Sequence, residues 1–283
     1  MSLIVSRASK DYVLQVSGQP AGTPTKQRIL YSATNGIAAL GYAGMDSIAG
    51  TPAARWLAAS LPYPRDLGGA LHTLAQSLST VRGDPKWTRD WLPRDFDVHV
   101  VGWQWSRNRY RPVVAGVSKA PGSTAFRIEY LPRYWHLDRG RPGPRGRRGF
   151  RFNVTAAPDT HISRPQLQSV VNRLRDIGPD DAENVIASTL RELSHTNPDT
   201  GPHCLSILLH PPPIARARVR FLAGLPPPES AASPSGNGHG HVLVAASPWL
   251  IGPSGISPPV PLTGRTELRL GTYVVSMEVS AAW

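Results

Sequence analysis

The densest group of residues that could do chemistry is a run of arginines in the middle of the chain. Seven arginines lie between positions 133 and 151, beside a single acidic residue, Asp138. Five of them stand close together in a Gly- and Pro-rich segment: Arg139, Arg141, Arg145, Arg147 and Arg148. Guanidinium groups hold phosphates and nearby aromatic rings stack on bases, so this basic loop predicts a polyanion or nucleic-acid site. An acidic partner protein fits the same pattern, and so does a solvated loop without a ligand.

Other reactive residue types are scattered. His239 and His241 form a lone pair in a flexible Gly-rich loop, and the remaining histidines have no recognisable metal-ligand spacing with carboxylates or cysteines. P-loop, dinucleotide-binding, HExxH and Gly-x-Ser-x-Gly motifs are absent from the sequence. We therefore predict no metal site and no cofactor. The one cysteine, Cys204, lies in an apolar run and is expected to be a buried structural thiol.

The elements that must position these residues follow from hydrophobic periodicity and turn signals. Two β-hairpins are expected over residues 4–17 and 28–42, then a helix opened by Thr51 and Pro52, then a helix over 67–81. A β meander over 97–134 and a strand at 150–156 come next, followed by helices that open at 163 and 180. The expected closing strands are 204–209, 219–222, 242–246 and 268–279, with a turn-rich stretch at 248–261.

This order alternates strands with helix pairs and predicts an α+β fold. Two antiparallel sheets packed face to face, each covered by two helices, satisfy it and make a four-layer αββα sandwich. We find no internal repeat and no interdomain linker, so one domain over residues 1–283 is expected, with the basic loop at 133–151 and a Pro/Ser/Gly-rich loop at 226–241.

The first sixty residues carry a family resemblance. They run through two strand pairs into Gly41-Tyr42-Ala43-Gly44 and then a helix, and a core strand begins near residue 2. This opening, with the element order, resembles the proteasome β-subunit branch of the N-terminal nucleophile hydrolases. The resemblance implies the αββα fold, amide hydrolysis by an N-terminal nucleophile whose own α-amine is the base, and assembly into homo-oligomers.

The resemblance assigns a catalytic set only in part. Ser2 would be the nucleophile once Met1 is removed, and Gly44 would supply an oxyanion-hole N–H. A lysine is expected just before residues 29–30, where Arg28 stands, with Lys26 two residues earlier on the same alternating face. The acidic residue expected at the end of the first hairpin is missing, since that stretch reads Val-Ser-Gly-Gln. The resemblance therefore implies this fold with a degraded active site.

Composition limits where the protein works. Hydrophobic residues make up 40% of the 283 residues, which is enough for a sizeable core, and the formal net charge is +12. No apolar run approaches the ~20 residues of a membrane-spanning helix, and the start of the chain lacks a secretory signal pattern. With a single cysteine, these features predict a soluble, bacterial-type cytoplasmic protein with no membrane partner.

Three functions follow from these observations. The first is a non-catalytic or weakly catalytic member of this family, a pseudoenzyme that acts in assembly or partner binding. The second is an N-terminal serine amidohydrolase or peptidase that uses Ser2, Lys26 or Arg28, and Gly44. The third is a polyanion-binding protein that acts through Arg133–Arg151.

Overall fold

The computed structural model describes residues 3–19, 25–32, 36–61, 66–86, 96–119, 123, 125–130, 151–155, 163–175, 177–196, 200–224, 245–252 and 255–280. It is a mixed α+β fold in which strands predominate, so the predicted fold class is confirmed at that level. The helices are α1 (Ala53–Ala59), α2 (Leu67–Gly83), α3 (Arg164–Arg173) and α4 (Pro179–Thr196).

Sheet A contains seven strands. Their order across the sheet is β10 (Arg151–Thr155), β1 (Ile4–Ala8), β2 (Val13–Gln19), β11 (His203–Leu209), β12 (Arg216–Leu222), β16 (Tyr273–Ser280) and β15 (Thr266–Leu270). Neighbouring strands run antiparallel except β12 and β16, which are parallel. The chain therefore returns to this sheet in its last segment.

Sheet B also contains seven strands. Their order is β14 (Gly255–Ser257), β13 (Trp249–Gly252), β3 (Gln27–Ser32), β4 (Gly36–Ala43), β7 (Asp97–Ser106), β8 (Arg109–Lys119) and β9 (Phe126–Tyr130). Only the β13–β3 pair is parallel. A small pair, β5 (Ser47–Ile48) and β6 (Thr51–Pro52), leads into α1.

The helix starts show how local sequence sets the element bounds. The Asp66 carboxylate accepts a hydrogen bond from the backbone N–H of Gly69 at 2.7 Å and so caps α2. Ser163 and Gln166 form the predicted capping box of α3. The prediction for α1 was wrong in detail: Thr51 and Pro52 belong to β6, and Pro52 takes the N-cap position without a side-chain hydrogen bond.

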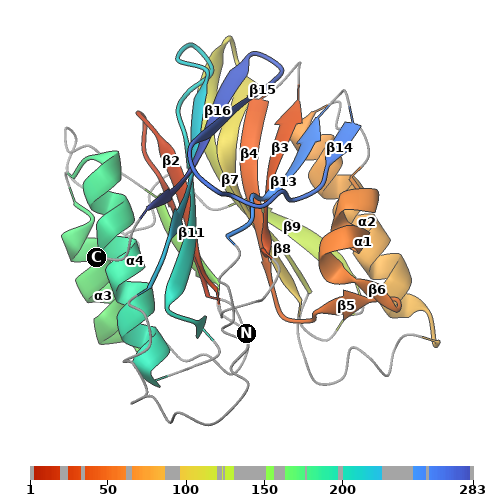
Figure 1. Ribbon diagram of the computed structural model, residues 1–283. Coiled ribbons are helices and arrows are strands. Elements are labelled where there is room, and N and C mark those ends of the chain that lie inside the picture. Colours follow the sequence, from red (N-terminus) through yellow and green to blue (C-terminus); the bar gives the residue numbers. More distant parts are fainter. Residues whose placement is uncertain are drawn as a thin grey trace, which may run out of the picture.

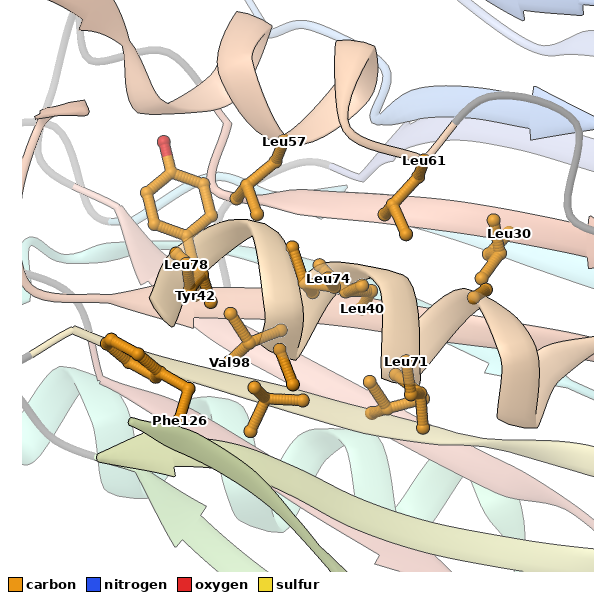
Figure 2. Close-up of a cluster of buried hydrophobic side chains, with 14 of the residues drawn as sticks. Leu30, Leu40, Tyr42, Leu57, Leu61, Leu71, Leu74, Leu78, Val98 and Phe126 are labelled. Atoms are coloured by element: carbon orange, nitrogen blue, oxygen red, sulfur yellow. The ribbon is translucent and has the colours of Figure 1, made fainter. Parts of the chain in front are cut away.

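The alternation of side chains in β4 divides the core. Ala38, Leu40 and Tyr42 face α1 and α2, whereas Ile37 and Ala39 face the other sheet. Figure 2 shows Leu71, Leu74 and Leu78 of α2 pointing at Leu40, Val98 and Phe126 of sheet B. This apolar cluster fixes α1 and α2 on one side of the strands.

Two further apolar clusters complete the packing. Strands of both sheets share one that includes Trp103, Val219 and Tyr273. The other joins α3 and α4 to sheet A through Leu14, Leu174 and Leu190. Figure 1 shows α3 and α4 on one side of the strands and α1 and α2 on the other.

The end of the chain departs from the prediction. The stretch expected to be turn-rich at 248–261 contains β13 and β14, and the single strand expected over 268–279 is the β15–β16 hairpin. Gly271, with φ +61, turns the chain between these strands. Of the strand expected at 242–246, residues 242–244 lie outside the described part, and Ala246 forms only an isolated bridge to Pro261.

Among the helices that the structure describes, none has the length and apolar character needed to cross a membrane.

Candidate functional site

Arg28, predicted as a local positive charge for catalysis, is buried in the core. Its side chain is 0% exposed, its Nη2 donates to the carbonyl oxygen of Ala54 in α1, and its guanidinium lies 5.0 Å from the centre of the Tyr42 ring. Burial lowers the pKa of Arg28 to about 10, although Tyr42 opposes this shift. Because β3 turns this side chain toward α1, Arg28 is a packing residue of sheet B.

Lys26 lies just before β3 and points the same way. Its Nζ is 2.9 Å from Oδ1 of Asp46 and 5.6 Å from the centre of the same Tyr42 ring. Lys26 and Arg28 thus share one face, as their spacing of two indicates. That face is directed toward α1 and the β4–β5 connection, so these two cations are directed away from the other sheet.

Of the remaining predicted site residues, the structure describes Gly44, which lies between Tyr42 and Asp46, two residues that contact Lys26. Gly44 follows β4 with φ +107, a left-handed conformation that favours glycine, and leads into β5 rather than directly into a helix. Ser2 lies outside the described residues. The same holds for the predicted polyanion-binding arginines: Arg139, Arg141, Arg145, Arg147 and Arg148.

A polar network between the two sheets is the site that the sequence reasoning missed. The Ser17 hydroxyl of β2 donates to Oε1 of Gln27 at 2.8 Å. The Gln27 amide donates in turn to the backbone carbonyl of Gln15 at 3.2 Å and to Oε1 of Gln15 at 3.3 Å. All three side chains are buried, and they join sheet A to sheet B at the ends of β2 and β3.

The network continues across both sheets. Gln15 Nε2 donates to the Ser6 hydroxyl at 3.2 Å and to the backbone carbonyl of His99 at 3.5 Å. Gly41 makes room for it, because a Cβ there would lie 2.9 Å from Oε1 of Gln15. Burial lowers the pKa of His99 to about 4, so its ring is neutral near pH 7.

The chemistry of this network is that of neutral hydrogen bonding. It holds two hydroxyls and two amides that satisfy one another, and none of these groups can take a proton from a hydroxyl near neutral pH. A signal for it was available in the sequence. Gln15 and Ser17 alternate with apolar residues in β2, and Gln27 precedes the alternating Ile29 and Tyr31 of β3.

A second buried polar group is charged and joins α4 to sheet A. Glu183 of α4 is 0% exposed and pairs with Arg218 at 3.1 Å and with Arg220 at 2.7 Å. Arg220 also pairs with Glu278 at 2.7 Å, and Arg218 with Asp180 at 2.6 Å. Each cation is neutralised within the group, so this cluster positions a helix on a sheet.

An open groove lies between α2 and the edge strand β9. Its volume is about 720 Å³, and its lining includes His72, Gln76, Ser79, Arg127 and Ile128. The backbone N–H of Phe126 donates to Oγ of Ser79 at 2.8 Å, so this N–H points away from β8. N–H groups alternate in direction along a strand, and those of Ile128 and Tyr130 therefore also point away from β8. In the part of the chain that the structure describes, no strand pairs with this edge.

The described residues contain no cluster of three or more His, Cys, Asp and Glu side chains able to hold a metal ion.

Comparisons with known proteins do not place the chain in a family. No protein family matches the sequence, and no curated protein matches it. Among solved structures, an Anbu mutant from Hyphomicrobium sp. strain MC1 is similar with a TM-score of 0.49 and 10% identity, over 75% of this chain and 82% of that one. Anbu from Yersinia bercovieri, described as an ancestral beta-subunit, has a TM-score of 0.49 and 10% identity over 74% and 80%. The helical Anbu assembly from Pseudomonas aeruginosa has a TM-score of 0.48 and 12% identity, over 74% of this chain and 81% of that one.

These findings correct the resemblance drawn from the first sixty residues. The chain matches no family, and likenesses with identities of 10–12% and TM-scores below 0.5 do not show membership of one. The prediction that this is an N-terminal nucleophile hydrolase of the proteasome β-subunit branch was wrong. The reason lies in the residues themselves. Strand order and a glycine turn describe an architecture, whereas the acidic residue expected at the end of the first hairpin is absent and Arg28 is a core residue.

Proposed function

We propose that this chain is a non-catalytic protein that acts by assembly and partner binding. The observation that carries the proposal is the closed, neutral network between the sheets. Ser6, Gln15, Ser17 and Gln27 satisfy one another there, and the nearby cations are turned toward α1. A site of this kind has no charged group to activate a nucleophile or to stabilise a developing charge.

The architecture that we propose for this function is the four-layer αββα sandwich, built as one domain over residues 1–283. Its support is the set of three apolar clusters, one between the sheets and one under each helix pair. The setting that we propose is cytoplasmic. The thiol of Cys204 is buried, and burial raises its pKa to about 12, which keeps it protonated and unreactive.

The partner that we propose is a second copy of this chain, bound at the edge of β9 that no described strand covers. Tyr130 is 54% exposed there, and the outward backbone groups of Ile128 and Tyr130 form a template for one more strand. Antiparallel pairing of two β9 strands would extend sheet B into the second copy and leave the α2 groove beside the joint. Such pairing is isologous, so it closes as a dimer.

The test of the non-catalytic proposal is covalent trapping at Ser2. The purified full-length protein is incubated with a hydroxyl-acylating β-lactone, and its intact mass is compared with that of Ser2→Ala. We expect no adduct on either protein, since the described network between the sheets offers neutral hydroxyls and amides and no base. A stoichiometric adduct on the wild type that is missing from Ser2→Ala would establish the alternative, an N-terminal serine hydrolase.

A further inference from the structure

Three turns gather at one end of the molecule, and they share an unusual composition. They are the β7–β8 turn (105–110), the β11–β12 turn (210–216) and the β15–β16 turn (269–274), which we call together the hairpin end. These segments contain four arginines and a histidine but no Asp or Glu. Figure 1 shows all three turns at the same end of the two sheets.

Hydrogen bonds hold the hairpin end together. Trp103 Nε1 donates to the carbonyl of Leu209 at 3.0 Å, and the Tyr273 hydroxyl donates to the carbonyl of His210 at 3.1 Å. The backbone N–H of Val274 donates to the carbonyl of Ala215 at 2.9 Å. The β7–β8 turn is therefore fixed against sheet A, and the three turns form one surface.

The arginines of this surface are free to bind. Arg107, Arg109, Arg216 and Arg269 are exposed, and within the described part of the chain none of them pairs with an acidic residue. By contrast, Glu183 neutralises Arg218 and Arg220, which lie two and four residues after Arg216 on β12. Within the three turns the arginines therefore have no acidic partner, and a carboxylate lies close by on the neighbouring β1–β2 turn, where Asp11 lies beside His210.

Exposed apolar side chains lie among these arginines. Trp105 is 43% exposed and packs edge-to-face on Tyr110, with ring centres 4.7 Å apart. Val274 pairs in register with Arg216 on one side and with Arg269 on the other, so an exposed apolar residue separates two cations. The two residues of the β7–β8 turn, Arg107 and Asn108, have φ values of 51° and 59°, which fix the arginine at the tip of a tight turn.

We propose that the hairpin end binds single-stranded nucleic acid. Unpaired guanidinium groups on three turns would contact successive phosphates, and the exposed ring of Trp105 offers a stacking platform for a base. The combination of unpaired arginines and an exposed indole favours nucleic acid over an acidic peptide. The carboxylates of such a peptide would bind the arginines, but the peptide would have no base to stack on Trp105. This proposal goes beyond assembly through β9, and it rests on different residues from those of the arginine-rich loop at 133–151.

The experiment is a fluorescence-anisotropy titration of the full-length protein with a labelled oligothymidylate of about 20 nucleotides. The test variant, Arg107→Gln/Arg216→Gln/Arg269→Gln, removes one cation from each turn. The matched control, Arg55→Gln/Arg173→Gln/Arg175→Gln, removes the same charge from exposed positions on and near α1 and α3. Thermal melting of each variant shows whether it remains folded.

We expect the test variant to bind at least about 10-fold more weakly, with the slope of log K against log salt reduced by about 2, and the control to stay close to the wild type. Trp105→Ala is expected to weaken binding by about 10-fold without changing that slope. The proposal is overturned if the test variant and the control weaken binding equally. It is also overturned if binding is lost only when Arg139, Arg141, Arg145, Arg147 and Arg148 are replaced, or if polyglutamate competes as well as oligothymidylate and Trp105→Ala has no effect.

Discussion

At the scale of single residues, Arg28 places a charged guanidinium in the core with few hydrogen-bond partners. Its Nη2 is hydrogen-bonded to Ala54, whereas its Nε and Nη1 are buried without a hydrogen bond to any described residue. Taking a charge out of water is costly unless it is paired, so a methionine of similar length is expected to pack there at least as well.

We therefore predict that Arg28→Met leaves the free energy of unfolding within about 1 kcal/mol of the wild type, or raises it. Arg28→Ala is the control for lost volume and is expected to fall about 2–4 kcal/mol below the methionine variant because it leaves a cavity. Urea unfolding at neutral pH measures both values. Equal, large losses in the two variants would show that the guanidinium itself stabilises the fold.

His99 gives the stability of the fold a pH dependence. Its pKa is about 4 in the folded protein, against an ordinary value of 6.5, because burial disfavours the charged ring. The unfolded chain therefore binds more protons between these values, and stability is full above pH 6.5 and declines as pH falls toward 4. The lowered pKa values of His203 and His210 act in the same direction.

From pH 7 to pH 5 we expect the wild type to lose on the order of 2 kcal/mol of unfolding free energy to His99 alone. The His99→Gln variant is expected to lose about 2 kcal/mol less unfolding free energy than the wild type between pH 7 and pH 5, whatever its stability at pH 7. Chemical unfolding of both proteins at the two pH values measures the difference. If their losses match, His99 is not a buried neutral ring.

Single residues also show how far a sequence can predict a site. Alternation correctly placed Lys26 and Arg28 on one face, but it could not say that this face looks toward α1. That direction depends on which side of β3 each helix covers, which is a property of the assembled sheets. The hydrogen bonds among Gln15, Ser17 and Gln27 form only when β2 and β3 meet across the sheet interface, so the sequence alone does not predict them.

At the scale of elements, β4 and β7 approach each other closely at Gly102. A Cβ on Gly102 of β7 would lie 2.3 Å from the carbonyl oxygen of Ile37 and 2.5 Å from Cβ of Ala38. These atoms belong to a neighbouring central strand and cannot move aside without breaking the ladder of sheet B. Gly116, on the adjacent strand β8, has its nearest atom, the carbonyl oxygen of Val98, at 3.8 Å.

Gly102→Ala is accordingly expected to cost more than about 3 kcal/mol or to prevent folding. Gly116→Ala is the matched control and is expected to stay within about 1 kcal/mol of the wild type. Thermal and urea unfolding of the two variants decides the matter. Similar stabilities would mean that β4 and β7 lie farther apart than described.

Elements with strong local signals were the predictable ones. The capping box at Ser163 and the leucine spacing of α2 were enough to place two helices, and alternation placed the first two hairpins. β13 and β14 were missed because short strands between prolines carry little periodicity. β13 is placed by its pairing with β3, more than two hundred residues earlier in the chain, and β14 by its pairing with β13.

At the scale of the whole molecule, the described strands of the two sheets end in four edges, β10, β15, β14 and β9, and proteins generally protect such edges against pairing. β15 presents charged side chains, including Glu267 and Arg269, and β14 has only three residues. The edge of β9 combines an exposed tyrosine with outward-pointing backbone groups and is the one that we assign to a second copy.

The most direct test of this account is the mass of the full-length protein in solution at tens of micromolar, measured by light scattering during size-exclusion chromatography. The wild type is expected at twice the chain mass of 30.6 kDa. Tyr130→Pro removes an outward N–H without touching a β8 ladder bond and is expected at the mass of one chain, whereas Tyr130→Val keeps the N–H and the dimer. A wild type that elutes as a single chain, or a Tyr130→Pro variant that stays dimeric, would contradict assembly through β9.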